Sequence, residues 1–283
     1  MSSWVEEMYI AKAGLFLEVL KRLRPAAEEE GRLVAQLLEA EGIGPGATIL
    51  DVGCGDGRLG LALAARGYRV VGIDVSPLLI EEARRRAREQ GVEAEFVAGD
   101  ARRIDKVLGG RRFNAIIFYW GSVIGYYSDS ADEDVLRRCR SVASPGARLL
   151  ILRHPNKLGL QLMASIHGYR GFYDVLDLED LVVVQRYVLE PGSSYMESAW
   201  HVYRRRGQDL EHLGELGSRM RLYTPDELAL LAGRAGWRLR RVFPRLSDPG
   251  SATALGASPT MNLVFEASVD GVGMRGEEVQ DRR

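Results

Sequence analysis

The sequence contains few of the residues and segments that mark special protein classes. Its 283 residues include two cysteines, Cys54 and Cys139, which lie in different predicted elements and provide no disulfide framework. So few cysteines indicate a protein of a reducing compartment, and we expect it to be cytoplasmic. No apolar run approaches the roughly 18 residues of a membrane-spanning helix. Residues 1–14 carry acids where a signal peptide carries basic residues, so neither a membrane partner nor secretion is expected.

Lysine is scarce, and neither sign of charge is in excess. Lys12, Lys21, Lys106 and Lys157 are the only lysines among 38 basic residues, and 39 acidic residues bring the net charge to −1. Because there is no global basic field, binding along the phosphates of a nucleic acid is disfavoured, and we expect no nucleic-acid partner. Hydrophobic residues make up 46% and charged residues 27%, as in globular chains that bury a core.

Hydrophobic periodicity predicts two helices followed by an α/β domain. Within residues 4–41, apolar residues recur at helical spacing and are interrupted at Pro25. Short apolar strands then alternate with amphipathic helices, which predicts a doubly wound, mostly parallel sheet with helices on both faces. The expected strands cover 48–52, 68–73, 94–97, 113–118 and 147–152, and the expected helices cover 59–66, 77–90 and 132–143.

The alternation stops after Pro155. Expected strands at 181–189, 195–205 and 209–223 form an antiparallel meander. A capping box at Thr224 then opens a helix that ends at Gly236, and strands at 237–243 and 261–267 complete a seven-stranded sheet. We expect N-terminal helices over 1–46 that form a lid, an α/β domain over 47–155 and 224–269, an antiparallel insertion over 156–223 that forms a substrate site or lid, and a disordered tail over 270–283.

A glycine-rich turn at 53–57 joins the first strand to the following helix. Gly53, Gly55 and Gly57 allow positive φ and let a ligand approach the backbone closely. Open parallel sheets bind ligands at the carboxyl ends of their strands, where this turn lies. A dinucleotide site would read G-x-G-x-x-G, but Arg58 stands where the third glycine is needed. A nicotinamide oxidoreductase is therefore disfavoured.

Acidic residues around the turn indicate which ligand it holds. Asp51 and Asp56 flank the turn, where they would repel a phosphate and attract a cation. Asp74 ends the second strand, where a carboxylate can bind both hydroxyls of a ribose. Asp100 follows the third strand and can accept a hydrogen bond from an exocyclic amine, with a plain helix cap as the alternative. A ligand with an adenosine, a positive centre and no phosphate satisfies all four, and S-adenosylmethionine is such a ligand.

These motifs resemble those of class I S-adenosylmethionine-dependent methyltransferases of the small-molecule type. The similar segments are LDVGCGDG at 50–57, VVGIDVSP at 70–77 and GDA at 99–101, in register over roughly residues 47–155. The segment YTPDELALLAGRAGW at 223–237 also resembles small-molecule members, as does FYWGSVIGYY at 118–127. The latter does not resemble the Asn-Pro-Pro-aromatic motif of amino-directed DNA, RNA and protein-glutamine enzymes. The resemblance implies a Rossmann-like methyltransferase fold and S-adenosylmethionine as cofactor.

The resemblance also implies the cofactor-binding residues. They are expected to be Asp51, Gly53, Cys54, Gly55, Gly57, Asp74, Val75, Asp100, Ala101 and Tyr119.

The acceptor side is less defined by the sequence. His154 follows the fifth strand directly and is a candidate general base, with capping or packing as the alternative. Tyr126 is a second catalytic candidate, and with Tyr119, Trp120 and Tyr127 it can build an aromatic wall for a cationic amine or a ring, with core or lid packing as the alternative. Tyr9 and Phe16 on the first helix are candidate lid contacts, with core packing as the alternative. His167, His201 and His212 show no metal-ligand spacing, so no metal is expected.

We expect a methyltransferase that acts on the nitrogen or oxygen of a small-molecule acceptor. The added segments would enclose the site, which favours a metabolite over a macromolecule. The alternatives are a methyltransferase acting on RNA or protein and a non-catalytic S-adenosylmethionine-binding protein.

Overall fold

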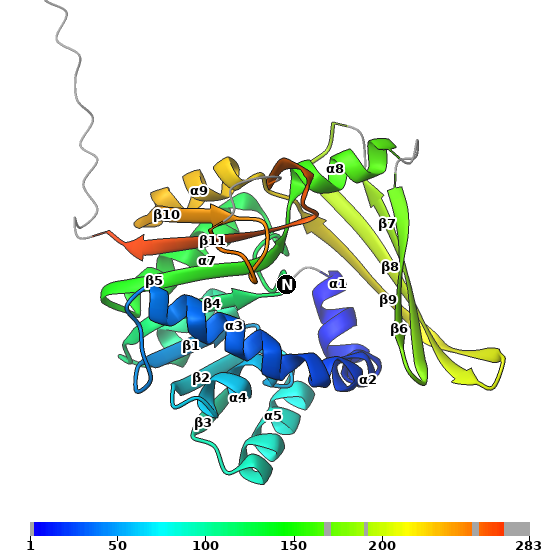
Figure 1. Cartoon of the computed structure of the whole chain (residues 1–283), viewed down its shortest axis with the longest axis horizontal. Coiled ribbons are helices and arrows are strands. Elements are labelled where there is room, and N and C mark those ends of the chain that lie inside the picture. Colours follow the sequence, from blue (N-terminus) through cyan, green and yellow to red (C-terminus); the bar gives the residue numbers. More distant parts are fainter. Residues whose placement is uncertain (1–2, 167–170, 190–191, 251–254, 269–283) are drawn as a thin grey trace, which may run out of the picture.

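The computed structural model describes residues 3–166, 171–189, 192–250 and 255–268, and it contains two sheets joined by N-terminal helices (Figure 1). The expected tail at 270–283 and His167 lie outside the described residues. Among the described residues, no helix has both the length and the hydropathy that crossing a membrane requires.

The larger sheet has seven strands in the order β3-β2-β1-β4-β5-β11-β10. Strands β1 to β5 pair with one another in parallel, whereas β11 is antiparallel to both β5 and β10. This confirms the predicted doubly wound, mostly parallel sheet. The strands are β1 Thr48–Val52, β2 Arg69–Asp74, β3 Ala94–Ala98, β4 Phe113–Tyr119, β5 Ala143–Pro155, β10 Trp237–Phe243 and β11 Thr260–Ala267.

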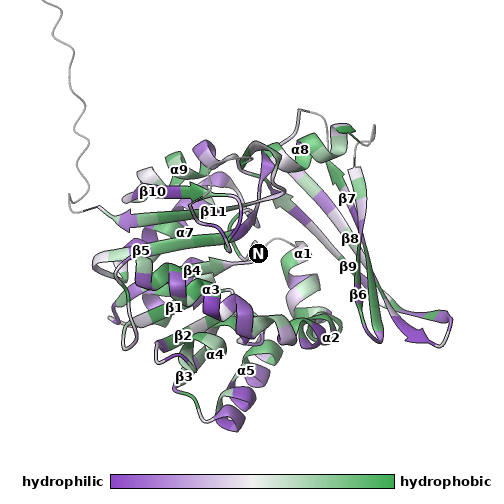
Figure 2. Cartoon of the chain, viewed as in Figure 1, coloured by the Kyte–Doolittle hydropathy of each residue, from purple (hydrophilic) through white to green (hydrophobic). Residues whose placement is uncertain are grey.

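Helices cover both faces of this sheet because its central strands are apolar on both sides. In β1, Leu50 and Val52 pack with one set of helices and Ile49 packs with the other. The first set consists of α6 Ile104–Val107, α7 Asp129–Ser141 and α9 Pro225–Arg234, and the second consists of α3 Ala27–Ala40 and α4 Arg58–Ala64. Helix α5, Pro77–Gln90, contacts β2 and β3. Strands β4 and β5 are predominantly hydrophobic, whereas α5 mixes hydrophilic and hydrophobic residues (Figure 2).

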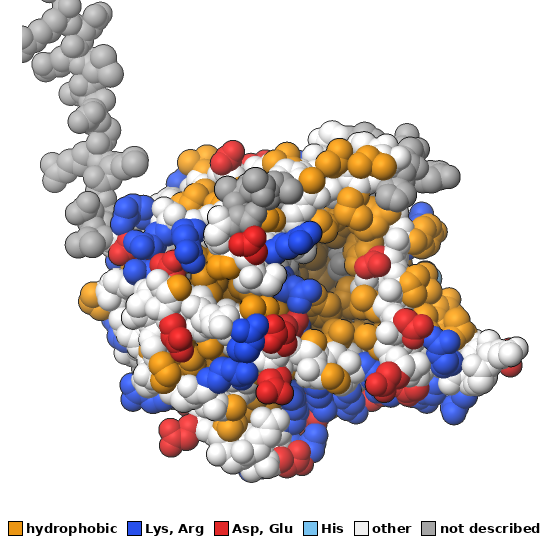
Figure 3. Space-filling view, in the orientation of Figure 1, with side chains coloured by type: hydrophobic (Ala, Val, Ile, Leu, Met, Phe, Trp, Pro, Cys, Tyr) orange, Lys and Arg blue, Asp and Glu red, His pale blue; other side chains and the backbone are white. Residues whose placement is uncertain are grey.

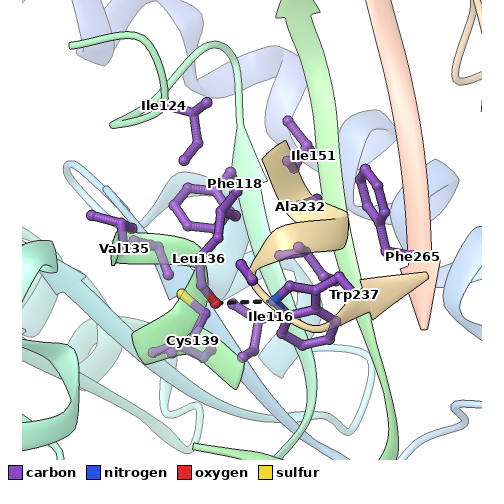
Figure 4. Packing of buried hydrophobic residues seen from close by; sticks show 14 of the residues in the cluster. Ile116, Phe118, Ile124, Val135, Leu136, Cys139, Ile151, Ala232, Trp237 and Phe265 are labelled. Atoms are coloured by element: carbon purple, nitrogen blue, oxygen red, sulfur yellow. Dashed lines mark hydrogen bonds between the residues drawn. The ribbon is translucent and has the colours of Figure 1, made fainter. Parts of the chain in front are cut away.

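The core between α7, α9 and the sheet is anchored by Trp237. This side chain is 1% exposed, and its indole Nε1–H donates to the backbone oxygen of Leu136 at 2.9 Å (Figure 4). Phe118, Cys139 and Phe265 belong to the same cluster. A buried indole without that acceptor would leave a polar group unpaired, so this bond fixes how β10 and α7 pack.

The smaller sheet is an antiparallel meander in the order β6-β7-β8-β9. Its strands are β6 Gly171–Leu178, β7 Leu181–Leu189, β8 Tyr195–Arg206 and β9 Asp209–Arg221, and helix α8, Lys157–Ile166, leads into it from β5. The predicted strands at 181–189 and 195–205 are present, but α8 and β6 were missing from the prediction. In Figure 1 this sheet stands beside the α/β part, with the N-terminal helices at the gap between them.

The N-terminal segment contacts both parts of the molecule. It consists of α1 Ser3–Glu6, a π-helical turn Glu7–Ala11, α2 Ala13–Leu23 and a 3₁₀ turn Arg24–Ala26, which contains Pro25 and separates α2 from α3 as predicted. Met8, Phe16 and Leu20 form one apolar cluster with Leu79 of α5 and Val183 of the meander. These helices therefore join the meander to the α/β domain.

Candidate functional site

A cavity of about 520 Å³ lies between the carboxyl ends of the parallel strands, the N-terminal helices and the meander. The space-filling view shows the molecule hollowed between its two parts, with hydrophobic side chains along the hollow (Figure 3). Predicted site residues that line the cavity are Asp51, Gly53, Cys54, Gly55, Asp74, Val75, Asp100, Ala101, Tyr119 and Tyr126. The fold therefore brings together residues that the sequence separates by up to 75 positions.

The glycine turn forms one wall of this cavity. Gly53 and Gly55 have φ of 72° and 55°, in the left-handed region that favours glycine. A Cβ atom on Gly53 would lie 2.8 Å from the Cβ of Ser122, so the turn also needs glycine for close packing. The prediction for Gly57 needs correction. It does not line the cavity, and a Cβ there would lie 2.7 Å from the Phe96 ring, so this glycine makes room for the core.

Asp74 is fixed by backbone donors at the end of β2. The backbone N–H groups of Gly55 and Ser76 each donate to its carboxylate at 2.9 Å. Burial raises its pKa, and these two backbone donors oppose that shift. A carboxylate held this way keeps lone pairs free toward the cavity.

Asp51 is buried at the end of β1, and its Oδ2 has no hydrogen-bond partner among the described residues. Burial, together with the nearby Asp74 carboxylate, raises the pKa of Asp51 to about 7.

Contrary to the sequence prediction, Asp56 does not face a ligand at the turn. Its carboxylate is fully buried, binds Arg24 at 2.8 Å and Arg86 at 3.0 Å, and does not line the cavity. Asp51 and Asp74 are therefore the acids available to a cationic ligand at the turn.

Asp100 begins a 3₁₀ turn after β3. Its carboxylate accepts from the backbone N–H of Arg102 at 2.8 Å and pairs with the Arg102 guanidinium at 2.6 Å. The same guanidinium lies over the Tyr127 ring, 4.6 Å from its centre. Asp100 therefore acts as a cap, the alternative weighed from the sequence, while it also lines the cavity.

The segment after β4 forms the wall opposite the glycine turn. Trp120 and Val123 have positive φ, 59° and 63°, which is unusual for these side chains. Two hydrogen bonds of the Gly125 backbone hold the segment. The Gly125 N–H donates to the Asp132 carboxylate at 2.8 Å, and the Gly125 carbonyl accepts from the Arg221 backbone N–H at 2.7 Å. This anchored backbone directs Tyr119, Trp120 and Tyr126 into the cavity.

Tyr126 meets the N-terminal segment inside the cavity. Its hydroxyl lies 2.7 Å from that of Tyr9, and the two rings stack with centres 5.7 Å apart. Phe16 packs edge-on against Tyr9 at 5.2 Å, and both residues line the cavity. Burial raises the pKa of Tyr126, so its hydroxyl keeps its proton at neutral pH.

The structure does not support His154 as the general base. Its side chain is 1% exposed and packs against Tyr223, with ring centres 6.5 Å apart, whereas its neighbours Arg153 and Pro155 line the cavity. Burial lowers the pKa of His154 to about 4, which keeps the ring neutral. The reason is a bulge: Arg153 has φ of 50°, and the register of β5 against β11 shifts there. Among the two predicted catalytic residues, only Tyr126 reaches the cavity.

Sequence reasoning missed a charged wall of the cavity. Arg58 and Arg153 line it, and both guanidinium groups pair with Glu30 of α3, at 2.6 Å for Arg153. The Arg58 guanidinium also lies over the rings of Tyr119 and Trp120, 5.6 and 5.5 Å from their centres. Arg58 was noted only for breaking the dinucleotide pattern, and nothing in the sequence places Glu30 beside it.

The inner face of the meander forms the far wall. It contributes polar side chains from Gln185, Tyr187, Ser198 and Ser218, the ring of Trp200, and thioethers from Met196 and Met220. The strands were predicted, and alternation groups these residues on one face, but the sequence does not show that this face meets the glycine turn. Among the described residues, no cluster of three or more histidines, cysteines or acids is arranged to hold a metal ion.

Comparison with known proteins gives the family context of this site. Residues 49–146 match the family model described as a methyltransferase domain. The chain is 30% identical over 168 residues to a ubiquinone biosynthesis O-methyltransferase of Xanthomonas axonopodis pv. citri, an alignment that covers 55% of the chain and 68% of that protein. It spans about half the length of other curated relatives that it matches, 47% in three mycobacterial proteins.

Solved structures share the fold over most of their length. The CcbJ methyltransferase from Streptomyces caelestis superposes with a TM-score of 0.70 at 21% identity, over 86% of this chain and 90% of that one. An amino pentose methyltransferase from Micromonospora echinaspora, with S-adenosylmethionine bound, gives 0.64 at 19% identity, over 90% and 97%. Both likenesses concern the fold.

Proposed function

Since the chain belongs to the family of S-adenosylmethionine-dependent methyltransferases, we propose that it transfers a methyl group to the nitrogen or oxygen of a small-molecule acceptor. The observation that carries this proposal is a single cavity that extends from the glycine turn to the inner face of the meander. A volume of about 520 Å³ suits small ligands, and the N-terminal helices line it as well. A macromolecular acceptor would need a more open site.

The residues at the turn fit the methyl donor. Asp51 and the fixed Asp74 carboxylate both line the cavity, and two acids there suit a ligand with a positive centre and a ribose diol. The backbone of Gly53 and Gly55 lets that ligand approach closely. When bound there, S-adenosylmethionine supplies an activated methyl group on sulfur. The domain limits given above, with residues 1–46 and 156–223 enclosing the site, are part of this proposal.

The protein's own contribution is mainly placement of the acceptor. Methyl transfer is a direct displacement, so holding the acceptor in line with the methyl group supplies most of the rate enhancement. Tyr126 keeps its proton at neutral pH and serves as a hydrogen-bond donor at the junction of lid and cavity. With His154 outside the cavity, an amine acceptor reacts from its unprotonated form. The acceptor proton then leaves through solvent.

The names of related proteins support an acceptor of metabolite size. The ubiquinone O-methyltransferase and the amino pentose methyltransferase are both named for small acceptors. Binding calorimetry tests the donor half of the proposal: S-adenosylmethionine and S-adenosylhomocysteine should bind in the micromolar range, and NAD should not bind. Tighter binding of NAD than of S-adenosylmethionine would refute it.

A further inference from the structure

One end of the cavity is built from thioethers and aromatic rings. Met196 of β8 and Met220 of β9 line it and are direct register partners, so their side chains are neighbours on the inner face of the meander. In the next row of this face, Phe172 of β6 and Tyr187 of β7 are also register partners, and their ring centres lie 5.0 Å apart. Leu160 of α8 belongs to the same apolar cluster and also lines the cavity. We call these five residues the methionine end of the cavity.

The methionine end lies close to the glycine turn. A Cβ atom on Gly121 would lie 3.7 Å from the Cε methyl of Met220. The next residue, Ser122, has its Cβ 2.8 Å from the position of a Cβ atom on Gly53. Because consecutive Cα atoms are about 3.8 Å apart, a single peptide unit separates these two contacts. A ligand at the methionine end therefore lies beside the proposed donor site.

The polar groups next to the methionine end interact within the chain. The hydroxyls of Ser198 and Ser218, which continue the row of Phe172 and Tyr187, lie 2.7 Å apart and form a hydrogen bond. The Tyr187 hydroxyl lies beside the Trp200 indole. A ligand at this end therefore meets mainly methyl groups, thioether sulfurs and ring carbons, and the burial of apolar surface has to provide its affinity.

The combination of thioethers and rings favours a flat aromatic ligand. Methionine sulfur makes favourable contacts with the edges of aromatic rings, and the flexible side chain adapts to their outline. An aromatic ring such as that of Phe172 pairs with another ring by offset stacking or edge-on contact. A polyhydroxylated acceptor would instead bury hydroxyl groups without hydrogen bonds, which costs binding free energy. Resting on the proposed methyl transfer, we propose that the methionine end binds an aromatic ring of the acceptor, and that the enzyme therefore selects aromatic small molecules.

The test uses the full chain saturated with S-adenosylhomocysteine and two probes of the same carbon skeleton, 2-naphthol and decahydro-2-naphthol. Ligand-observed NMR titration should show about fivefold tighter binding of 2-naphthol. Met220→Gln keeps the length of the side chain but places an amide against the ring, so 2-naphthol should bind about tenfold more weakly. Leu210→Gln, a similar change at an exposed position of the same strand, should leave 2-naphthol binding unchanged.

Affinity for S-adenosylhomocysteine separates acceptor binding from a general loss of structure. Met220→Gln should bind S-adenosylhomocysteine as wild type does, and a parallel loss of both affinities in the folded variant would overturn the inference. If Met220→Gln does not fold, Phe172→Leu, which removes a ring at a half-buried position, should show the weaker 2-naphthol binding and decides alone.

Two further outcomes separate this inference from the proposed function. The inference is overturned, and the proposed function left intact, if wild type binds S-adenosylhomocysteine but does not distinguish the two probes, or if the folded variant binds 2-naphthol as wild type does. A protein that binds neither S-adenosylmethionine nor S-adenosylhomocysteine overturns both.

Discussion

The hydroxyl groups of Tyr9 and Tyr126 lie 2.7 Å apart, although 117 residues separate them in the chain. Tyr9 belongs to the π-helical turn at the N-terminus, and Tyr126 belongs to the segment after β4 that lines the proposed donor site. This contact connects the N-terminal helices to the residues that would surround the reacting groups. Movement of the first helices would therefore change access to the cavity.

We predict that the N-terminal helices close over the bound cofactor. Hydrogen exchange with and without S-adenosylhomocysteine should show added protection over residues 4–24 and part of 156–223, together with 53–57. Tyr9→Phe should weaken the response over 4–24, because it removes the bond to Tyr126 while keeping the ring. Tyr203→Phe, near the far end of the meander, serves as the control. Protection confined to 53–57 would mean that these segments are not a lid, and the case for a small acceptor would weaken.

Asp74 should contribute directly to cofactor affinity. Asp74→Ala removes a charge-assisted hydrogen bond worth about 1.5–3 kcal/mol, so the dissociation constant for S-adenosylmethionine should rise roughly tenfold to a hundredfold. Calorimetry measures this, and circular dichroism confirms folding. Asp209→Ala, at an exposed position in the meander, should leave affinity unchanged. Equal affinity of folded Asp74→Ala and wild type would remove Asp74 from the site.

Asp51 should make the stability of the unliganded protein pH-dependent. Its pKa rises on folding from 3.8 to about 7, so the folded state binds more protons between these values and loses stability as pH rises through them. The loss amounts to at most about 4 kcal/mol. Asp51→Asn should therefore melt several degrees above wild type at pH 8, with a much smaller difference at pH 4.

The same residue should couple cofactor binding to proton release. A cation near Asp51 favours its carboxylate form, so wild type should release protons on binding S-adenosylmethionine at pH 6–7. Calorimetry in buffers of different ionisation enthalpy measures this release, which Asp51→Asn should lack. Equal proton release by the variant would show that Asp51 is not the group that titrates.

His154 should affect acid stability. Its pKa falls on folding from 6.5 to about 4, so the folded state binds fewer protons in that window and loses stability as pH falls through it. Urea unfolding at pH 7 and pH 4.5 measures how much free energy of unfolding each protein loses between these pH values. The loss should be smaller in His154→Leu than in wild type, by up to about 3 kcal/mol. A parallel loss in both proteins would show that His154 does not titrate as its burial implies.

The sequence predicted those elements of the fold whose signal lies in residues that are neighbours along the chain. The buried parallel strands were found because each is a short apolar run between turn residues, as in Phe113–Tyr119. Strand β6 was missed because Tyr173 and Val175 are exposed, which leaves no clean alternation to detect. Helix α8 was missed for a similar reason, since its exposed leucines obscure the amphipathic pattern.

The site shows the same division. Gly53, Gly55, Asp51 and Asp74, which line the cavity, could be grouped from the sequence because the turn and the following strand end follow a fixed local spacing. His154 was misplaced because a bulge at Arg153 changes which face the next residue points to, and the bulge depends on pairing with β11 about 110 residues away. The Arg58–Glu30 pair and the inner face of the meander also depend on tertiary contacts.

The central claim is methyl transfer to a small molecule, and turnover tests it most directly. The protein should be incubated with methyl-labelled S-adenosylmethionine and, in separate reactions, with a metabolite extract, total RNA and total protein, with Asp74→Ala run in parallel. The account predicts labelled product in the metabolite fraction, strongly reduced for Asp74→Ala. Label that accumulates in RNA or protein, or a donor that binds without any turnover across all fractions, would contradict it.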